Sequence, residues 1–338
     1  MPLPITRGAA SALGFGLFGS TLSASIAVAF SDSNGLFVYP WASGFGTKYS
    51  NPASLPQYGA KTAFSPLGNF IAYVSDSSSP YIAVYPWSPG FGTKYSNPST
   101  LPAGASKGVA FSPSGNAIAV AHNNSPYISV YPWSSGFGTK YANPSTLPTG
   151  TGGGVAFSPS GNAIALAHAS SPYVSVYPWS SGFGSKYANP GTLPAFNSYG
   201  VVFNPAGNTI AVSHDSDPYV TVYPWSSGFG SKYANPSTLP ASTGQQVRFN
   251  PAGDAIAIAV ENSTSVVAYP WSSGFGTKYA NPSTLPAGNG RGLAFAPSGN
   301  TIAVGSTASP YVTAYPWSSG FGTKYSNPAT LPHHIVVE

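Results

Sequence analysis

The chain has 338 residues, of which 6% are charged, with a formal net charge of +5 and no cysteine. An average soluble domain has about 25% charged residues, so this chain must meet water mainly through Ser, Thr, Asn and Tyr. Without cysteine it can form neither disulfides nor thiolate metal sites, and its twelve Lys and Arg residues are too few for a nucleic-acid footprint. From this low count of cations we expect no nucleic-acid partner. No apolar run reaches the ~20 residues of a membrane helix, so we also expect no membrane insertion.

A tryptophan recurs every 46 residues, in seven copies of one phrase. Tyr lies two residues before each Trp, Phe four after, Lys seven after and Tyr eight after, and Asn-Pro and Leu-Pro follow. Repeats of ~40–50 residues with strand patterning are typical of propeller blades, which form rings of about four to eight. The sequence therefore predicts an all-β fold, a seven-bladed β-propeller with four antiparallel strands per blade. The seven tryptophans are Trp41, Trp87, Trp133, Trp179, Trp225, Trp271 and Trp317.

The N-terminal residues imitate a signal peptide, because Arg7 precedes an apolar stretch and Ser23-Ala24-Ser25 resembles a cleavage site. The repeat instead assigns this stretch to the first blade, since "IAVAF" at 26–30 overlays "IAVAH" at 118–122. We expect residues 1–13 to form an arm, residues 14–332 the propeller and residues 333–338 a tail. The arm and the tail would help to close the ring or would dock to a partner.

Within the third copy the pattern predicts strands a to d at residues 108–113, 117–122, 127–133 and 139–144, separated by Gly, Pro and Ser turns. Strand b places Ile118 and Val120 on one face and alanines on the other. A bulky face meeting a small face suits two sheets stacked at close range. Pro132 cannot donate to a ladder, so it is expected at a bulge or at the end of strand c.

The connections between strands divide the copies into a constant and a variable part. Antiparallel strands place the a–b and c–d turns on one face and the b–c and d–a loops on the other. The c–d turn reads "SSGFG" in five of the seven copies, whereas the b–c and d–a loops differ from copy to copy. We call the second face the variable face. Binding residues tend to lie in such loops, although exposed loops also drift without function.

Candidate binding residues follow from this face. Five residues stand 26 positions before their Trp, directly before the strand nearest the central channel: Lys61, Lys107, Tyr199, Gln245 and Arg291. They are suited to hydrogen-bonding sugars or pairing with acidic groups, or they are solvated loop tips. Tyr58 and Phe196 add stacking surfaces. Asp215 and Asp217 fall short of the six to eight oxygens that Ca²⁺ usually takes.

Two further rings of residues have structural interpretations. His122, His168 and His214 share a spacing of 46, but the same slot holds Phe30 and Val260, which indicates packing rather than a metal site. A lysine lies on strand d of every copy, where it would protect an edge strand or form a partner-facing belt. We therefore predict no metal and no cofactor. The lysines are Lys48, Lys94, Lys140, Lys186, Lys232, Lys278 and Lys324.

Two resemblances bear on identity. "FSPSGN" followed by "AIAVAH" and "YISVYPW" resembles the pattern of WD40-like and YVTN-type propellers, although the Gly-His and Trp-Asp dipeptides are missing. The phrase "YPWSSGFGTKYANPSTLP" looks like repeats in structural proteins of tailed phages, and residues 8–19 resemble a Gly/aromatic segment of such virion proteins. This likeness implies a virion location, multiple copies and other virion proteins as partners.

The expected channel strands offer little for catalysis. Arg248 is the ionisable side chain that they present, and general acid–base chemistry needs several positioned titratable groups. We therefore predict a non-enzymatic virion protein of a fibre, a tail or a capsid decoration, which binds a host-surface glycan or a protein. The alternatives are a bacterial lectin-like or adhesive propeller at the cell surface, and an assembly scaffold without a ligand.

Overall fold

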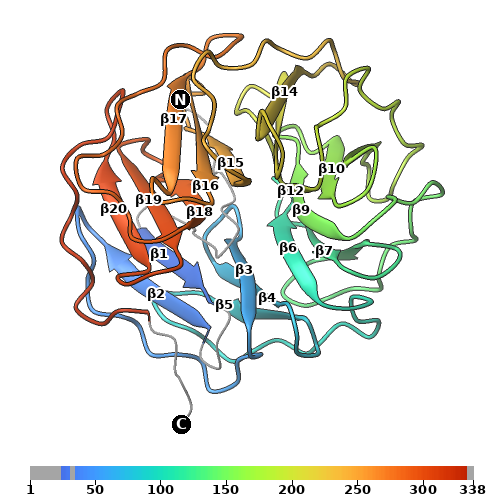
Figure 1. Ribbon diagram of the computed structural model, residues 1–338. Coiled ribbons are helices and arrows are strands. Elements are labelled where there is room, and N and C mark those ends of the chain that lie inside the picture. The colour runs from blue at the N-terminus through green and yellow to red at the C-terminus, as the bar shows by residue number, and fades with distance from the viewer. Residues whose placement is uncertain (1–23, 31–34, 333–338) are drawn as a thin grey trace, which may run out of the picture.

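Seven small antiparallel sheets stand around a common centre (Figure 1). The computed structural model describes residues 24–30 and 35–332, in which there are twenty strands and no helix. In the described residues six sheets have three strands and the first has two, and we number these blades 1 to 7 in chain order. The seven-fold ring predicted from the tryptophan spacing is confirmed, with one blade per repeat. The predicted arm, the tail and residues 14–23 lie outside the described part of the chain.

Each blade takes its strands consecutively from the chain, with the first strand of a complete blade innermost. Blade 1 contains β1 (Ala24–Ala29) and β2 (Leu36–Trp41), so the "IAVAF" stretch belongs to the ring as expected. The other blades contain β3 (Gly59–Phe64), β4 (Phe70–Ser75), β5 (Ile82–Pro86); β6 (Ser106–Phe111), β7 (Ala117–His122), β8 (Ile128–Pro132); β9 (Gly152–Phe157), β10 (Ala163–His168), β11 (Val174–Pro178); β12 (Ser198–Phe203), β13 (Thr209–His214), β14 (Val220–Pro224); β15 (Gly244–Phe249), β16 (Ala255–Val260), β17 (Val266–Pro270); and β18 (Gly290–Phe295), β19 (Thr301–Ser306), β20 (Val312–Pro316).

The prediction of a fourth strand in each blade was wrong. Strand b of the third copy has the predicted bounds, and strand c ends at Pro132 as expected, but residues 139–144 form no ladder. This outer segment is attached to β8 by a hydrogen bond from the Tyr141 amide to the Val130 carbonyl, at 2.9 Å. The Lys140 ammonium donates to the Tyr141 carbonyl at 3.2 Å. In a strand ladder this carbonyl would accept a hydrogen bond from a backbone amide of a neighbouring strand, but here it accepts one from a side chain.

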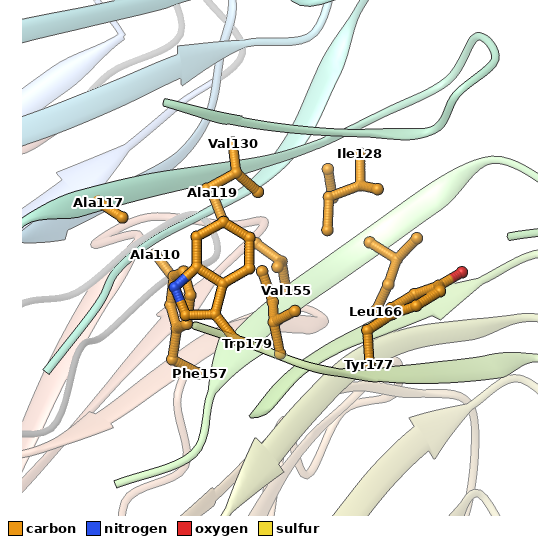
Figure 2. Close-up of a cluster of buried hydrophobic side chains, with 12 residues drawn as sticks. Ala110, Ala117, Ala119, Ile128, Val130, Val155, Phe157, Leu166, Tyr177 and Trp179 are labelled. Atoms are coloured by element: carbon orange, nitrogen blue, oxygen red, sulfur yellow. The ribbon is translucent and has the colours of Figure 1, made fainter. Parts of the chain in front are cut away.

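Neighbouring blades are joined by an apolar and aromatic layer. Between blades 3 and 4, Ala119 and Val130 of one sheet face Val155, Leu166 and other side chains of the next (Figure 2). Trp179 of blade 4 completes this layer, because its ring meets that of Tyr141 from the preceding repeat edge-on at 5.1 Å. The alternation of small and bulky residues along strand b thus serves close stacking between sheets, as the sequence indicated.

The same contacts close the ring between its first and last blades. Tyr131 Oη donates to the Thr100 carbonyl of the preceding repeat at 2.9 Å, and the equivalent Tyr of each remaining blade makes the same bond. In blade 1 the donor is Tyr39 and the acceptor is the Thr330 carbonyl at the far end of the chain, at 2.8 Å. Among the described strands, none from the C-terminal repeat joins the sheet of blade 1, and none from the N-terminal repeat joins the sheet of blade 7. Within the described residues the contacts across the seam are side-chain contacts of the kind found between the other blades.

The innermost strands of blades 3 to 6 approach one another closely. A Cβ added at Gly154 would lie 2.7 Å from the carbonyl oxygen of Tyr199 in the next blade, and one at Gly200 would lie 3.2 Å from the Cα of Gln246. Glycine is required where backbones pack at this distance. These strands therefore fix the positions of the residues next to the glycines. No helix in the described residues is long and apolar enough to cross a membrane.

Candidate functional site

The structure places the two variable sets of loops on one face. The Asp215 amide, which follows β13, donates to the Asn197 carbonyl before β12 at 3.1 Å, and equivalent bonds join these loops in blades 2 to 7. On the opposite face the Trp225 amide donates to the Asn208 carbonyl at 2.8 Å, which ties the a–b corner to the end of strand c. The constant turns thus make one face, and the variable face lies at the other end of the ring.

Of the five residues that stand 26 positions before their Trp, four occupy equivalent places in their blades. Lys107, Tyr199, Gln245 and Arg291 each lie where the register of the innermost strand shifts by one residue. The expectation that they precede the strand was wrong, because each is the second residue of its strand and forms a β-bulge. A bulged residue is left out of the ladder and re-aims its side chain. Side chains at this position are therefore set by the strand rather than by a loose loop.

Lys61 does not share this position, although it has the same spacing from its tryptophan. The loop between β4 and β5 is one residue longer than its equivalents, so Ala60 takes the bulge and Lys61 pairs with Val74. Lys61 therefore matches the ring position of Gly108, Gly154, Gly200, Gln246 and Gly292. The signal was present in the sequence, since Phe64 lies 23 residues before its Trp while the equivalent Phe111 lies 22 before.

Blades 5, 6 and 7 bring polar side chains together on the variable face. Gln245 Nε2 donates to the Glu261 carboxylate at 3.0 Å, and the Arg291 guanidinium of the next blade forms an ion pair with the same carboxylate. Tyr199 Oη lies 3.4 Å from Asp215 Oδ2. Burial raises the pKa of the Tyr199 hydroxyl, and the negative charges of Asp215 and Glu261 raise it further. We call Tyr199, Asp215, Gln245, Glu261 and Arg291 the polar arc.

Glu261 and Gln246 were not recognised as site residues in the sequence. Glu261 follows β16 at the place that Asp215 occupies in the preceding blade, so this repeat position carried the signal. Gln246 stands in a ring of glycines, and its Oε1 accepts a hydrogen bond from the Leu293 amide of the next blade at 2.7 Å. In blades 3 to 5 a glycine at this position lets neighbouring backbones approach closely. In blade 6 the side chain of Gln246 instead joins β15 to β18 through its hydrogen bond with the Leu293 amide.

A second group of charges lies on blades 2 and 3. Burial raises the pKa of the Asp76 carboxyl, and the Lys107 ammonium of the neighbouring blade partly offsets that rise. Burial lowers the pKa of Lys61 to about 7, and the positive charges of Arg248 and Lys107 lower it further. Arg248 is 9% exposed, and burial lowers its pKa to about 10. Blades 2 and 3 therefore present two lysines beside one carboxyl whose ionisation burial disfavours.

Aromatic side chains are exposed on the same face. Phe196 is 48% exposed, and its ring lies 5.9 Å from that of Tyr173 in the preceding blade. Tyr58 is 43% exposed and stands in the loop before β3. Asp217 is exposed in the loop after β13. In the described part of the chain no three His, Asp or Glu side chains gather in a way that could hold a metal ion, and Asp217 joins no such group.

The two repeated rings serve the fold. His122 Nε2 lies 3.0 Å from Ser129 Oγ, and His168 and His214 have the same kind of hydroxyl partner on strand c. All three imidazoles are fully buried, so the interpretation as packing residues agrees with their surroundings. On the perimeter the Lys140 ammonium donates to Asn143 Oδ1 at 2.5 Å, and the other six lysines have the equivalent Asn partner.

The comparisons with known proteins support the architecture alone. No protein-family model matches the sequence, and no curated protein matches it either. Among solved structures the fold is similar to Kuenenia stuttgartiensis hydrazine synthase, with a TM-score of 0.59 over 75% of each chain. The sequences are 16% identical over that match, so the likeness extends to the fold and not to the activity. The chain is thus an all-β protein with seven propeller-like repeats of about 46 residues.

Proposed function

We propose that this chain is a non-enzymatic structural or attachment protein of a tailed-phage particle, which binds a host-surface glycan through its variable face. The observation that carries the glycan part is the polar arc. It gathers a hydroxyl, two carboxylates, an amide and a guanidinium from blades 5, 6 and 7. Outside these variable positions the three blades follow the same repeat sequence. Hydroxyl-rich ligands are recognised by such mixed donors and acceptors when a rigid scaffold holds them in place.

Two details of the arc and its surroundings favour a sugar. Asp215 Oδ1 is buried and accepts no hydrogen bond among the described residues, so a rotation of this side chain would present an acceptor to a ligand hydroxyl. The exposed ring of Phe196, supported by Tyr173, offers an apolar face on which the C–H side of a sugar ring can pack. A ligand spanning both features would cover blades 4 and 5. Virion location rests on the repeat phrase, which resembles those of phage structural proteins.

A glycan array probed with the full chain and with point variants tests the binding. We expect Tyr199→Ala and Phe196→Ala each to weaken binding at least about tenfold, which corresponds to about 1.4 kcal/mol. Leu67→Ala is the matched control, because Leu67 is 68% exposed in an a–b corner of the opposite face. If no glycan binds the wild-type chain, glycan recognition is wrong, and a protein partner or a pure scaffold takes its place.

The particle assignment has a separate test. A reconstruction of a phage particle containing this chain should show a seven-bladed ring with its variable face directed away from the particle. A ring whose variable face is covered by a neighbouring virion protein would contradict the attachment role. Absence of the chain from purified particles would contradict the virion role and favour a lectin-like propeller of the cell surface.

A further inference from the structure

Two cations of the innermost strands, Lys107 and Arg248, act on a third, Lys61, near the axis of the ring. Lys61 lies on β3 of blade 2, Lys107 on β6 of blade 3 and Arg248 on β15 of blade 6. Blades 2 and 6 are not neighbours, so the positive charge of Arg248 that reaches Lys61 does so across the axis. Lys61 and Lys107 come from consecutive blades and Arg248 from a distant one, and the phrase repeated around each Trp contains none of them.

The place of Lys61 in the fold is unusual. Four other blades have glycine at this ring position, and blade 6 has Gln246, whose side chain is engaged with the Leu293 amide. Lys61 makes no hydrogen bond or ion pair with any described residue, and it remains partly exposed to solvent. Lys107, at the bulge beside it, is exposed. The position therefore holds a half-buried lysine on which the positive charges of Arg248 and Lys107 act.

Among the residues that the structure describes, the acidic groups of the variable face do not balance this charge. Glu261 is paired with Arg291, and Asp215 lies against Tyr199. Asp76 acts on Lys107, but burial raises the pKa of its carboxyl. A partly buried ammonium is unfavourable when no counter-charge lies near it, as is the case for Lys61 among the described residues, and a bound anion relieves that cost.

We propose that Lys61 and Lys107 form an oxyanion-binding site at the variable-face end of the axis, for a carboxylate, sulfate or phosphate group. Lys61 is the inner ligand, Lys107 closes the site at the rim and Arg248 adds positive charge from across the axis. This inference rests on the proposed function and makes the glycan an acidic one, with its charged group on blades 2 and 3 and its hydroxyls directed toward the polar arc.

Binding at such a site is coupled to a proton. The charged groups that act on Lys61 are Arg248 of β15 and Lys107 of β6, and Asp76, after β4, acts on Lys107. Because the pKa of Lys61 is about 7, most of its amines are neutral near pH 8 and become protonated when an anion binds. The complex should therefore take up close to one proton near pH 8 and far less near pH 6, and its affinity should fall as pH rises through 7.

Isothermal titration calorimetry of the full chain with sulfate, D-glucuronate and D-glucose tests the site. Two buffers of different ionisation enthalpy near pH 8 report the proton uptake. We expect both anions to bind with uptake and glucose not to bind at this site. Lys61→Gln, which gives blade 2 the residue that blade 6 has as Gln246, should weaken anion binding at least about tenfold and abolish the uptake. Lys324→Gln removes the same charge from the perimeter and should change neither quantity.

The outcomes separate this inference from the proposed function. Equal anion binding by wild-type and Lys61→Gln would overturn the site, as would equal binding of glucuronate and glucose. Should Lys61→Gln fail to fold, Lys107→Gln, which copies Gln245 at the same bulge, must weaken the anion instead. Glucuronate binding more tightly than sulfate supports an acidic glycan, and the reverse order overturns the link to a sugar. If the array yields only neutral glycans that need Tyr199, the proposed function stands and this inference falls.

Discussion

Three buried histidines make the stability of the ring sensitive to acid. His122, His168 and His214 are fully buried at the ends of their strands, and burial lowers the pKa of each to about 4. In an unfolded chain a histidine titrates near 6.5. The unfolded state therefore binds protons first, and the free energy of unfolding is fully retained above pH ~6.5 and decreases as the pH falls toward ~4.

The expected effect is large. Each histidine pKa is about 2.5 below its ordinary value, and one pKa unit corresponds to about 1.4 kcal/mol. Each should remove about 3 kcal/mol from the free energy of unfolding between pH ~6.5 and ~4, and the three together about 10 kcal/mol. This sum is comparable to the whole stability of a typical protein, about 5–15 kcal/mol. The raised pKa of Asp76 acts in the opposite direction, because the folded state then binds its proton first.

The chain provides its own control for this prediction. Blade 6 has Val260 in the histidine slot and Val267 seven residues later, where Ser129 stands under His122. The double variant His122→Val, Ser129→Val rebuilds that apolar pair in blade 3 and leaves no hydroxyl without its partner. Urea unfolding near pH 7.5 and near pH 4.5 measures the loss of stability in both proteins.

We expect the double variant to lose about 2–3 kcal/mol less than the wild type between these two pH values. Equal losses in the two proteins would refute the argument, because the imidazole would then not be the group that titrates. A wild-type stability that stays constant between the two pH values would refute it more directly, since no buried neutral histidine would be required.

Two further predictions concern the joints of the ring. Tyr39→Phe should lower stability by about 1 kcal/mol through loss of the bond to Thr330, and hydrogen exchange should rise in β1 and β2. The same change at Tyr131, away from the seam, should cost as much without raising exchange in β1, and equal exchange of β1 in both variants would contradict the role of Tyr39 in holding the first blade to the last. Gly154→Ala should destabilise by about 1–3 kcal/mol because its Cβ meets a carbonyl oxygen at 2.7 Å, as measured by urea unfolding. Gly191→Ala, with no atom within 4 Å of its Cβ, should change little, and a similar loss in both would contradict close backbone packing.

The sequence predicted the ring because the joints recur in every repeat. Trp133, Tyr131 and Tyr141 all contact the neighbouring blade or the segment before it, so their constant spacing reports the packing between blades. The outer segment misled the strand assignment, since its composition is that of a strand while its Tyr141 carbonyl accepts a hydrogen bond from the side chain of Lys140. Whether a segment forms a strand ladder depends on the segment and on the strand beside it. A local sequence pattern describes only the segment itself.

The candidate site was harder to predict for a related reason. Counting from Trp87 placed Lys61 with Lys107, and one extra residue in a single loop moved it to the next ring position. The contacts of Glu261 with Gln245 and Arg291 join two blades, so no spacing within one repeat indicates them. Residues that depart from the repeat can be found in the sequence, but their partners depend on the closed ring.

The departures from the repeat are not spread evenly around the variable face. Blade 4 has Gly153 at the bulge and Ala169 after β10, so it presents no polar side chain at either of the two positions that build the arc. On one side of this gap lie the cations of blades 2 and 3, and on the other lies the mixed arc of blades 5 to 7. The two sides differ in character, because two lysines lie on one and a mixture of carboxylates, amide, hydroxyl and guanidinium on the other. If both of our proposals hold, one extended ligand with an acidic group at one end and hydroxyls at the other would cover both sides. The same glycan should then lose binding to Lys61→Gln and to Tyr199→Ala, and a glycan that loses binding to only one of them would contradict a single shared ligand.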